Sequence, residues 1–132
     1  MSRLDSLLDE PGTSIAVVGA TDDPRKYGGI AYRQLKSMGY RVFAVNPGRE
    51  TVDGDRAYPD LAALPEAPTI VNFVVPAHIG ARVADEALAL GYTNLWFQPG
   101  AESASLTTRL AEAGADVLTD ACIMVRARWA KR

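Results

Sequence analysis

The sequence predicts an α/β fold: a doubly wound, parallel, five-stranded sheet with helices on both faces. Five short apolar runs recur along the 132 residues, and most lack the alternation of a strand with one solvated face. Amphipathic segments separate these runs, and such alternation is typical of βαβ units. Right-handed crossovers then predict the strand order 3-2-1-4-5 in a single domain, residues 1–132.

The expected strands are short runs of aliphatic and β-branched residues. In chain order they cover residues 14–19, 41–46, 69–75, 94–98 and 116–118. In sheets of this class, ligands bind beyond the carboxyl ends of the strands, near the point where the strand order reverses. The residues that directly follow each strand are therefore the candidates for function.

Helical patterns fill the intervals between the strands. They cover 30–39, a shorter segment at 59–64, then 77–90 and 103–113, and Ser103 is a favourable N-cap for the last of them. Glycines stand where the three longer patterns end. The side chains expected to face the sheet are Ala31, Leu35 and Met38, then Ile79, Val83, Ala87, Leu88 and Leu90, and finally Leu106 and Leu110.

The two ends of the sequence carry weaker patterns. Leu4, Leu7 and Leu8 have helical spacing and are expected to cap the sheet. The tail, residues 122–132, mixes apolar residues such as Trp129 with basic ones, which predicts a last strand or helix packed on the body.

Composition excludes several functional classes. The net charge of −2 offers no basic excess for binding nucleic acid. No apolar run reaches the ~18–20 residues of a membrane span, and the acidic first residues do not resemble a secretory signal, so a cytoplasmic location is expected. One cysteine and one histidine are too few for a disulfide or a four-ligand zinc site. The sequence does not decide whether the protein binds a protein partner or forms a homo-oligomer.

The segment after the first strand, GATDDPRKYGG, has the features of a phosphate-binding loop, although it lacks G-x-G-x-x-G. Gly19 and Ala20 would let backbone N–H groups approach an anion. Thr21 adds a hydroxyl, while Arg25 and Lys26 add positive charge. The alternative is a plain turn between strand and helix.

The segment after the second strand bears on the type of nucleotide. An NAD site would carry an acidic residue near here, but the sequence has Asn46, Pro47 and the cationic Arg49. This favours a phosphorylated ribose, as in NADP or coenzyme A (CoA). The alternative is that Pro47 only forms a turn.

The ends of the last three expected strands complete the candidate site. A Val-Pro step follows the third strand, and its apolar wall suits an adenine ring. A polar Gln-Pro-Gly turn follows the fourth strand, and the single cysteine follows the fifth. These residues are Val75 and Pro76, then Gln98, Pro99 and Gly100, and finally Cys122.

Taken in order, these motifs resemble one family. VVGATDDPRKYGG, YRVFAVNPGRETVDGDRAYPDLAALP, VNFVVPAHI, LWFQPGAES and DACIMV are similar to segments of the small bacterial and archaeal CoA-binding proteins. Their domain is similar to the CoA-binding half of the succinyl-CoA synthetase α subunit. The resemblance covers about residues 14–125 and implies a Rossmann-like domain that binds CoA.

The resemblance also implies a role for each motif. Residues 19–21 would hold the pyrophosphate, with the basic residues 25–26 close by. Residues 46–49 would lie by the nucleotide, with Arg49 near the ribose 3′-phosphate. Residues 75–76 would lie near the adenine or the pantetheine arm, and residues 98–100 and Cys122 would complete the site.

The sequence departs from the family pattern around its cysteine. Family members often carry Arg between the Asp and the Cys and a Glu a few residues later, but here Ala121 and Arg126 stand in those places. The chain also ends where a synthetase would continue into its second domain, and it shows no evident general acid–base pair. These departures favour binding without catalysis.

Cys122 is the candidate nucleophile, and its reactivity depends on its surroundings. The charge of Asp120 is expected to raise the thiol pKa and make it less reactive. Cys122 is then either an inert core residue or a residue near the CoA thiol that forms a reversible mixed disulfide.

Three functions stay open at this level. The first is a non-catalytic module that binds CoA or an acyl-CoA. The second is a fragment of an NADP-linked oxidoreductase or epimerase, which would use the same strand ends. The third is a regulatory partner protein with a degenerate nucleotide site. Retention on CoA-agarose rather than NADP-agarose would separate the first two.

Overall fold

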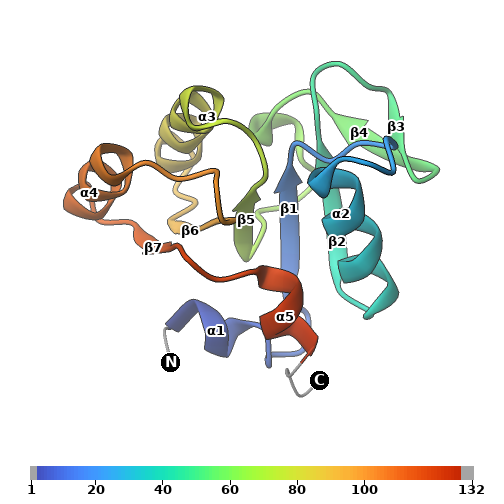
Figure 1. Ribbon diagram of the computed structural model, residues 1–132, viewed down its shortest axis with the longest axis horizontal. Coiled ribbons are helices and arrows are strands. Elements are labelled where there is room, and N and C mark those ends of the chain that lie inside the picture. The colour runs from blue at the N-terminus through green and yellow to red at the C-terminus, as the bar shows by residue number, and fades with distance from the viewer. Residues whose placement is uncertain (1–2, 129–132) are drawn as a thin grey trace.

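The computed structural model describes residues 3–128, in which strands and helices alternate along the chain (Figure 1). The strands are β1 (Ser14–Val18), β2 (Arg41–Val45), β3 (Thr51–Val52), β4 (Asp55–Tyr58), β5 (Ile70–Phe73), β6 (Asn94–Phe97) and β7 (Asp116–Leu118). The helices are α1 (Arg3–Leu7), α2 (Tyr27–Ser37), the 3₁₀ helix η1 (Leu61–Ala63), α3 (Ala77–Ala89), α4 (Ala104–Glu112) and α5 (Ile123–Arg128).

The strands form one sheet in the order β3-β4-β2-β1-β5-β6-β7. All neighbouring pairs are parallel except β3 and β4, so the predicted parallel α/β fold is confirmed. The predicted count of five strands and the predicted order are wrong. The third expected strand is β5, which pairs with β1, and the place outside β2 belongs to β4. Only Ala57 of β4 is buried, so this edge strand has no apolar run that the sequence could show.

The order of the strands reverses between β1 and β5. From β1 the chain moves outward through β2 to β4, then returns to β5 and moves in the opposite direction through β6 to β7. Loops at the carboxyl ends of β1 and β5 therefore diverge and leave a crevice, which is where doubly wound sheets bind ligands.

The sheet is buried on both faces, which explains the lack of alternation in its sequence. All five residues of β1 are buried. Ile15 and Val17 belong to a core that they share with α1, α2 and α5, whereas Ala16 and Val18 belong to a second core under η1, α3 and α4. The helices thus form two layers around the sheet (Figure 1).

The helices α3 and α4 follow the expected boundaries closely, whereas α2 begins three residues earlier than expected, so that Tyr27, Gly28 and Gly29 belong to the helix and not to the loop. Ser103 caps α4 as predicted, since its hydroxyl accepts a hydrogen bond from the N–H of Leu106 at 3.3 Å. The residues predicted to face the sheet are at least partly buried, with one exception. Leu90 is 39% exposed, because the buried stripe of α3 runs through Gly80 and Ala84 and the helix ends before Leu90.

The ends of the described chain pack against each other. The tail forms α5, which confirms a helix there, while Trp129 lies outside the described residues. Arg126 pairs with Asp5 of α1 at 3.0 Å, and the Asp5 side chain is only 7% exposed. Arg126 therefore joins the two terminal helices. Within residues 3–128, no helix combines the length and apolar character needed to cross a membrane.

Candidate functional site

Two pockets lie at the carboxyl ends of the strands, and Val75 lines both of them. The β1–α3 pocket has a volume of about 510 Å³ and includes Gly19, Asn46, Pro47, Ile79 and Val83 among its lining residues. The β5–β6 pocket has a volume of about 380 Å³ and includes Tyr27, Pro76, Gln98, Pro99 and Gly100. The two pockets therefore meet at the point where the strand order reverses.

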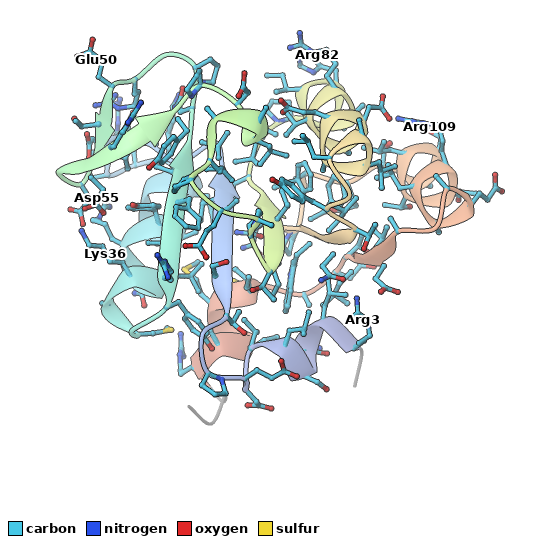
Figure 2. The ribbon with its side chains drawn as sticks, turned by 180° about the vertical axis from the view of Figure 1, so that it is seen from behind. Arg3, Lys36, Glu50, Asp55, Arg82 and Arg109 are labelled. Carbon is cyan, nitrogen blue, oxygen red and sulfur yellow. The ribbon has the colours of Figure 1, made fainter. Side chains whose placement is uncertain are left out.

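The β1–α3 pocket has mainly apolar walls, and its carboxylates are already engaged. Asp60 caps η1 by accepting a hydrogen bond from the N–H of Ala63 at 2.9 Å. Glu86 accepts a hydrogen bond from the N–H of Leu61 at 3.3 Å. Arg82 extends from α3 at the rim and pairs with no other described residue (Figure 2). The pocket thus suits a flat apolar group with a cation at its edge.

Gly19 keeps the end of β1 in close contact with the end of β5. Its φ of +98° is in the left-handed region, and a Cβ there would lie 2.5 Å from the carbonyl oxygen of Val74. It would also lie 2.8 Å from a methyl carbon of Val75. A side chain at position 19 would therefore displace the residues between the two pockets.

The loop after β1 folds onto itself and then leads into α2. Thr21 is buried, and its hydroxyl accepts a hydrogen bond from the N–H of Asp23 at 3.3 Å. Arg25 pairs with Asp23 through two hydrogen bonds of 3.1 Å, although its side chain is 88% exposed. Lys26 stands at the start of α2. The predicted residues that are not among those lining the two pockets are Ala20, Thr21, Arg25, Lys26, Arg49 and Cys122.

The loops after β1 and β2 are joined by two side-chain interactions. Asn46 donates a hydrogen bond to the carbonyl of Ala20 at 2.9 Å, and its own oxygen accepts one from Gly48 at 2.8 Å. Arg49 forms an ion pair with Asp22 at 2.9 Å. The loop after β2 therefore lies against the loop after β1, and the sequence gave no sign that Arg49 would pair with Asp22.

Cys122 lies behind the β5–β6 pocket, between two residues that line it. The hydroxyl of Tyr27 lies 3.1 Å from the sulfur, and the amide of Gln98 donates to it at 3.5 Å. The other end of Gln98 accepts a hydrogen bond from the N–H of Ile123 at 2.9 Å, which fixes the start of α5. The predicted residues Gln98 and Cys122 are thus brought together.

The surroundings of Cys122 overturn the expectation that its pKa is raised. Burial alone raises the pKa of the thiol, but hydrogen bonds from Tyr27, from Gln98 and from the backbone of Val125 and Met124 outweigh burial and lower it. Asp120 is not among the main causes of the shift in the pKa of Cys122. The same contact, with burial, raises the pKa of Tyr27 to about 12, so Tyr27 stays protonated and can donate to the sulfur.

Sequence reasoning missed the pocket residues that do not follow one of the five expected strands. Pro59 and Asp60 follow β4, a strand that was not expected. Ile79 and Val83 were expected to face the sheet, and their apolar spacing gave no sign that they line a pocket. Tyr27 directly precedes Gly28 and Gly29, and this glycine pair is the one local signal that could have pointed to Tyr27 as a residue of the β5–β6 pocket.

Comparisons with known proteins give one consistent result. A family model described as a CoA binding domain matches residues 13–128. An uncharacterized protein of Bacillus subtilis, YneT, is 30% identical over 111 residues, which are 84% of this chain and 82% of that protein. A solved structure of a conserved hypothetical protein from Pyrococcus furiosus has a TM-score of 0.83 and 42% identity, with 86% of this chain and 97% of that chain covered.

A shorter stretch of similarity links the chain to a larger enzyme subunit. The α subunit of an ADP-forming acetate–CoA ligase from Pyrococcus furiosus is 38% identical over 63 residues, which are 47% of this chain. The match spans only 14% of that subunit, so it concerns one part of the ligase. Because the family model spans most of the sequence, from residue 13 to residue 128, the chain belongs to the CoA binding domain family.

Proposed function

We propose that this protein binds coenzyme A or an acyl-CoA without catalysing a reaction itself. The observation that carries the proposal is the meeting of two unlike pockets at Val75, where the strand order reverses. The adenine would occupy the apolar β1–α3 pocket, and the pantetheine arm would pass over Val75 and Pro76 into the β5–β6 pocket. Membership of the CoA binding domain family supports this assignment.

The charged parts of the ligand would lie between the two pockets. The N–H of Gly19 already donates to the carbonyl of Val45 at 2.9 Å, so the pyrophosphate would be met by the N–H groups of Ala20 and Thr21, with Gly19 keeping a side chain out of the way. The exposed Arg25 and Lys26 would add positive charge beside it. Arg49, next to Asn46 and Pro47, would meet the ribose 3′-phosphate.

The thiol end of the ligand would lie near Cys122. Gln98, Pro99 and Gly100 line the β5–β6 pocket, and Gln98 touches the Cys122 sulfur. With CoA disulfide as the co-reactant, the Cys122 thiolate would attack one sulfur of the disulfide. A Cys122–CoA mixed disulfide would form, and one CoA thiolate would leave, so that the electrons balance.

The chemistry of the pocket walls supports binding rather than catalysis. The two carboxylates of the β1–α3 pocket, Asp60 and Glu86, already accept hydrogen bonds from the backbone around η1. His78 is not among the residues that line either pocket. A general acid–base pair aimed at a ligand is therefore not evident among the lining residues of these two pockets.

Calorimetric titration of the purified protein with CoA, NADP and NAD tests the proposal. Native mass spectrometry of freshly purified protein would first show whether a ligand is already bound. We expect CoA to bind with a clear preference over both dinucleotides. Preferential binding of NADP would contradict the proposal and support an oxidoreductase or epimerase site. Binding of none of the three would indicate that the fold acts through a protein partner.

A further inference from the structure

Arg49, which is proposed to bind the 3′-phosphate, already forms an ion pair with a carboxylate of the protein. Its Nη2 lies 2.9 Å from Oδ2 of Asp22, and the two side chains are 38% and 40% exposed. The Nε of Arg49 also donates to the carbonyl of Thr51 at 3.3 Å. A phosphate that reaches this guanidinium therefore arrives beside a carboxylate of the same sign.

Asp22 does not depend on Arg49 for its position. Its Oδ1 accepts a hydrogen bond of 2.7 Å from the N–H of Asp53, in the turn between β3 and β4. This bond is the main cause of the lowered pKa of Asp22; burial opposes it, and Arg49 lowers the pKa further. Asp22 is thus ionised at neutral pH, and its carboxylate would stay in place if Arg49 turned away.

The β3–β4 hairpin that holds Asp22 is fixed by other contacts. Lys36 of α2 pairs with Asp53 at 3.1 Å and with Asp55 at 2.8 Å, and Lys36 and Asp55 lie side by side in Figure 2. Tyr32 donates a hydrogen bond to Asp55 at 2.8 Å. A change of charge at position 22 would therefore leave the hairpin attached to α2.

We propose that Asp22 is a specificity-determining residue, which competes with the ligand's 3′-phosphate for Arg49. The inference rests on the proposed function, because it needs CoA to bind with its 3′-phosphate at Arg49. In the free protein Asp22 neutralises Arg49. In the complex, either Arg49 interacts with both Asp22 and the phosphate, or its ion pair with Asp22 breaks. In both cases the phosphate binds more weakly than it would to an Arg49 that had no carboxylate beside it.

Asp22→Asn removes the charge with little other change. The asparagine oxygen can still accept the hydrogen bond from Asp53, while the neutral amide no longer attracts Arg49. Asp23→Asn is the matched control, since it makes the same charge change one residue later at a carboxylate that pairs with Arg25 instead. Both variants are titrated with CoA and with dephospho-CoA, which lacks the 3′-phosphate.

We expect Asp22→Asn to bind CoA about two- to fivefold more tightly, with dephospho-CoA unchanged, because the exposed pair is screened by solvent. The gain should shrink at high salt and should vanish in the double variant Asp22→Asn/Arg49→Gln. Asp23→Asn should leave the ratio of the two affinities unchanged.

Four results would overturn the inference. Weaker CoA binding by Asp22→Asn would show that Asp22 positions Arg49 for the phosphate instead of competing with it. An equal gain for both ligands, or the same gain in Asp23→Asn, would indicate a general effect of charge. If the unaltered protein binds no CoA, the proposed function itself fails and this inference falls with it.

Discussion

The two pockets that meet at Val75 offer unlike surroundings to a ligand. In the β1–α3 pocket the walls are mainly apolar, and the carboxylates Asp60 and Glu86 are occupied by the backbone of η1. In the β5–β6 pocket, polar groups of Tyr27 and Gln98 converge on one sulfur atom. Both pockets are lined mainly by apolar residues, but among the described residues charged side chains lie only in the lining of the β1–α3 pocket, whereas the Cys122 sulfur lies behind Tyr27 and Gln98 of the β5–β6 pocket. Under the proposed function, the adenine of CoA would occupy the first pocket and its pantetheine arm would reach the second.

Gly19→Ala should have the largest effect, because it acts on both pockets at once. The new methyl group would lie 2.5 Å from the Val74 carbonyl in a backbone conformation that alanine disfavours. We expect a loss of about 2–4 kcal/mol in the free energy of unfolding. CoA binding should fall below detection. Urea denaturation and calorimetry would measure the two effects.

Gly114→Ala is the matched control for backbone strain. Gly114 has a similar φ of +96°, but no atom lies within 4 Å of the position its Cβ would take. We expect a loss of about 1–2 kcal/mol in stability and normal CoA binding. If both variants lose the same stability and both still bind CoA, then close packing at Gly19 does not shape the two pockets.

Arg49→Ala should affect the nucleotide end and leave the thiol end unchanged. Removal of a charge-assisted contact to phosphate should weaken CoA roughly tenfold, with dephospho-CoA nearly unaffected. Arg25→Ala, which removes a cation paired with Asp23 and proposed to lie beside the pyrophosphate, is the comparison variant and should weaken CoA and dephospho-CoA equally. Equal losses for the two ligands in the Arg49→Ala variant would remove Arg49 from the 3′-phosphate. Thiol alkylation of Cys122 should proceed at the normal rate in the variant.

Tyr27→Phe should have a several-fold effect, limited to the thiol end. Loss of the hydroxyl removes a hydrogen bond that lowers the pKa of Cys122, so less thiolate should form at neutral pH. Intact mass spectrometry after treatment with CoA disulfide should show slower formation of a CoA adduct, and no adduct on Cys122→Ala. An unmodified protein, or an equal adduct on Cys122→Ala, would exclude a mixed disulfide at this cysteine.

The central sheet could be predicted from the sequence, whereas its edge could not. Buried strands such as β1 and β5 appear as apolar runs because both of their faces are covered. The edge strand β4 buries only Ala57, and Arg56 lies over the ring of Tyr58 at 5.2 Å, so its sequence resembles a polar loop. Missing β4 made the predicted strand order wrong.

The candidate site divides in the same way. Residues directly after the buried strands could be named, because the topology of a doubly wound sheet fixes where the strand ends meet. Contacts between distant segments could not be named. Tyr27 and Cys122 are 95 residues apart, and Asp22 and Arg49 are 27 residues apart. Neither pair has a local signal in the sequence, since both depend on how the loops turn.

The smallest expected effect is on the pH dependence of stability, to which the carboxylates Asp22, Asp23 and Asp55 contribute and Cys122 does not. The pKa values of Asp22, Asp23 and Asp55 are lowered, that of Asp55 chiefly by its hydrogen bond with Lys36. The unfolded chain therefore binds more protons than the folded one below about pH 4, and stability falls as pH falls through the folded pKa values. In urea denaturation at pH 7 and pH 3, Asp55→Asn should lose less stability on acidification than the unaltered protein. Cys122→Ala should behave normally, because a thiol does not titrate in that range; an equal acid loss in Asp55→Asn would show that these carboxylates are not its cause.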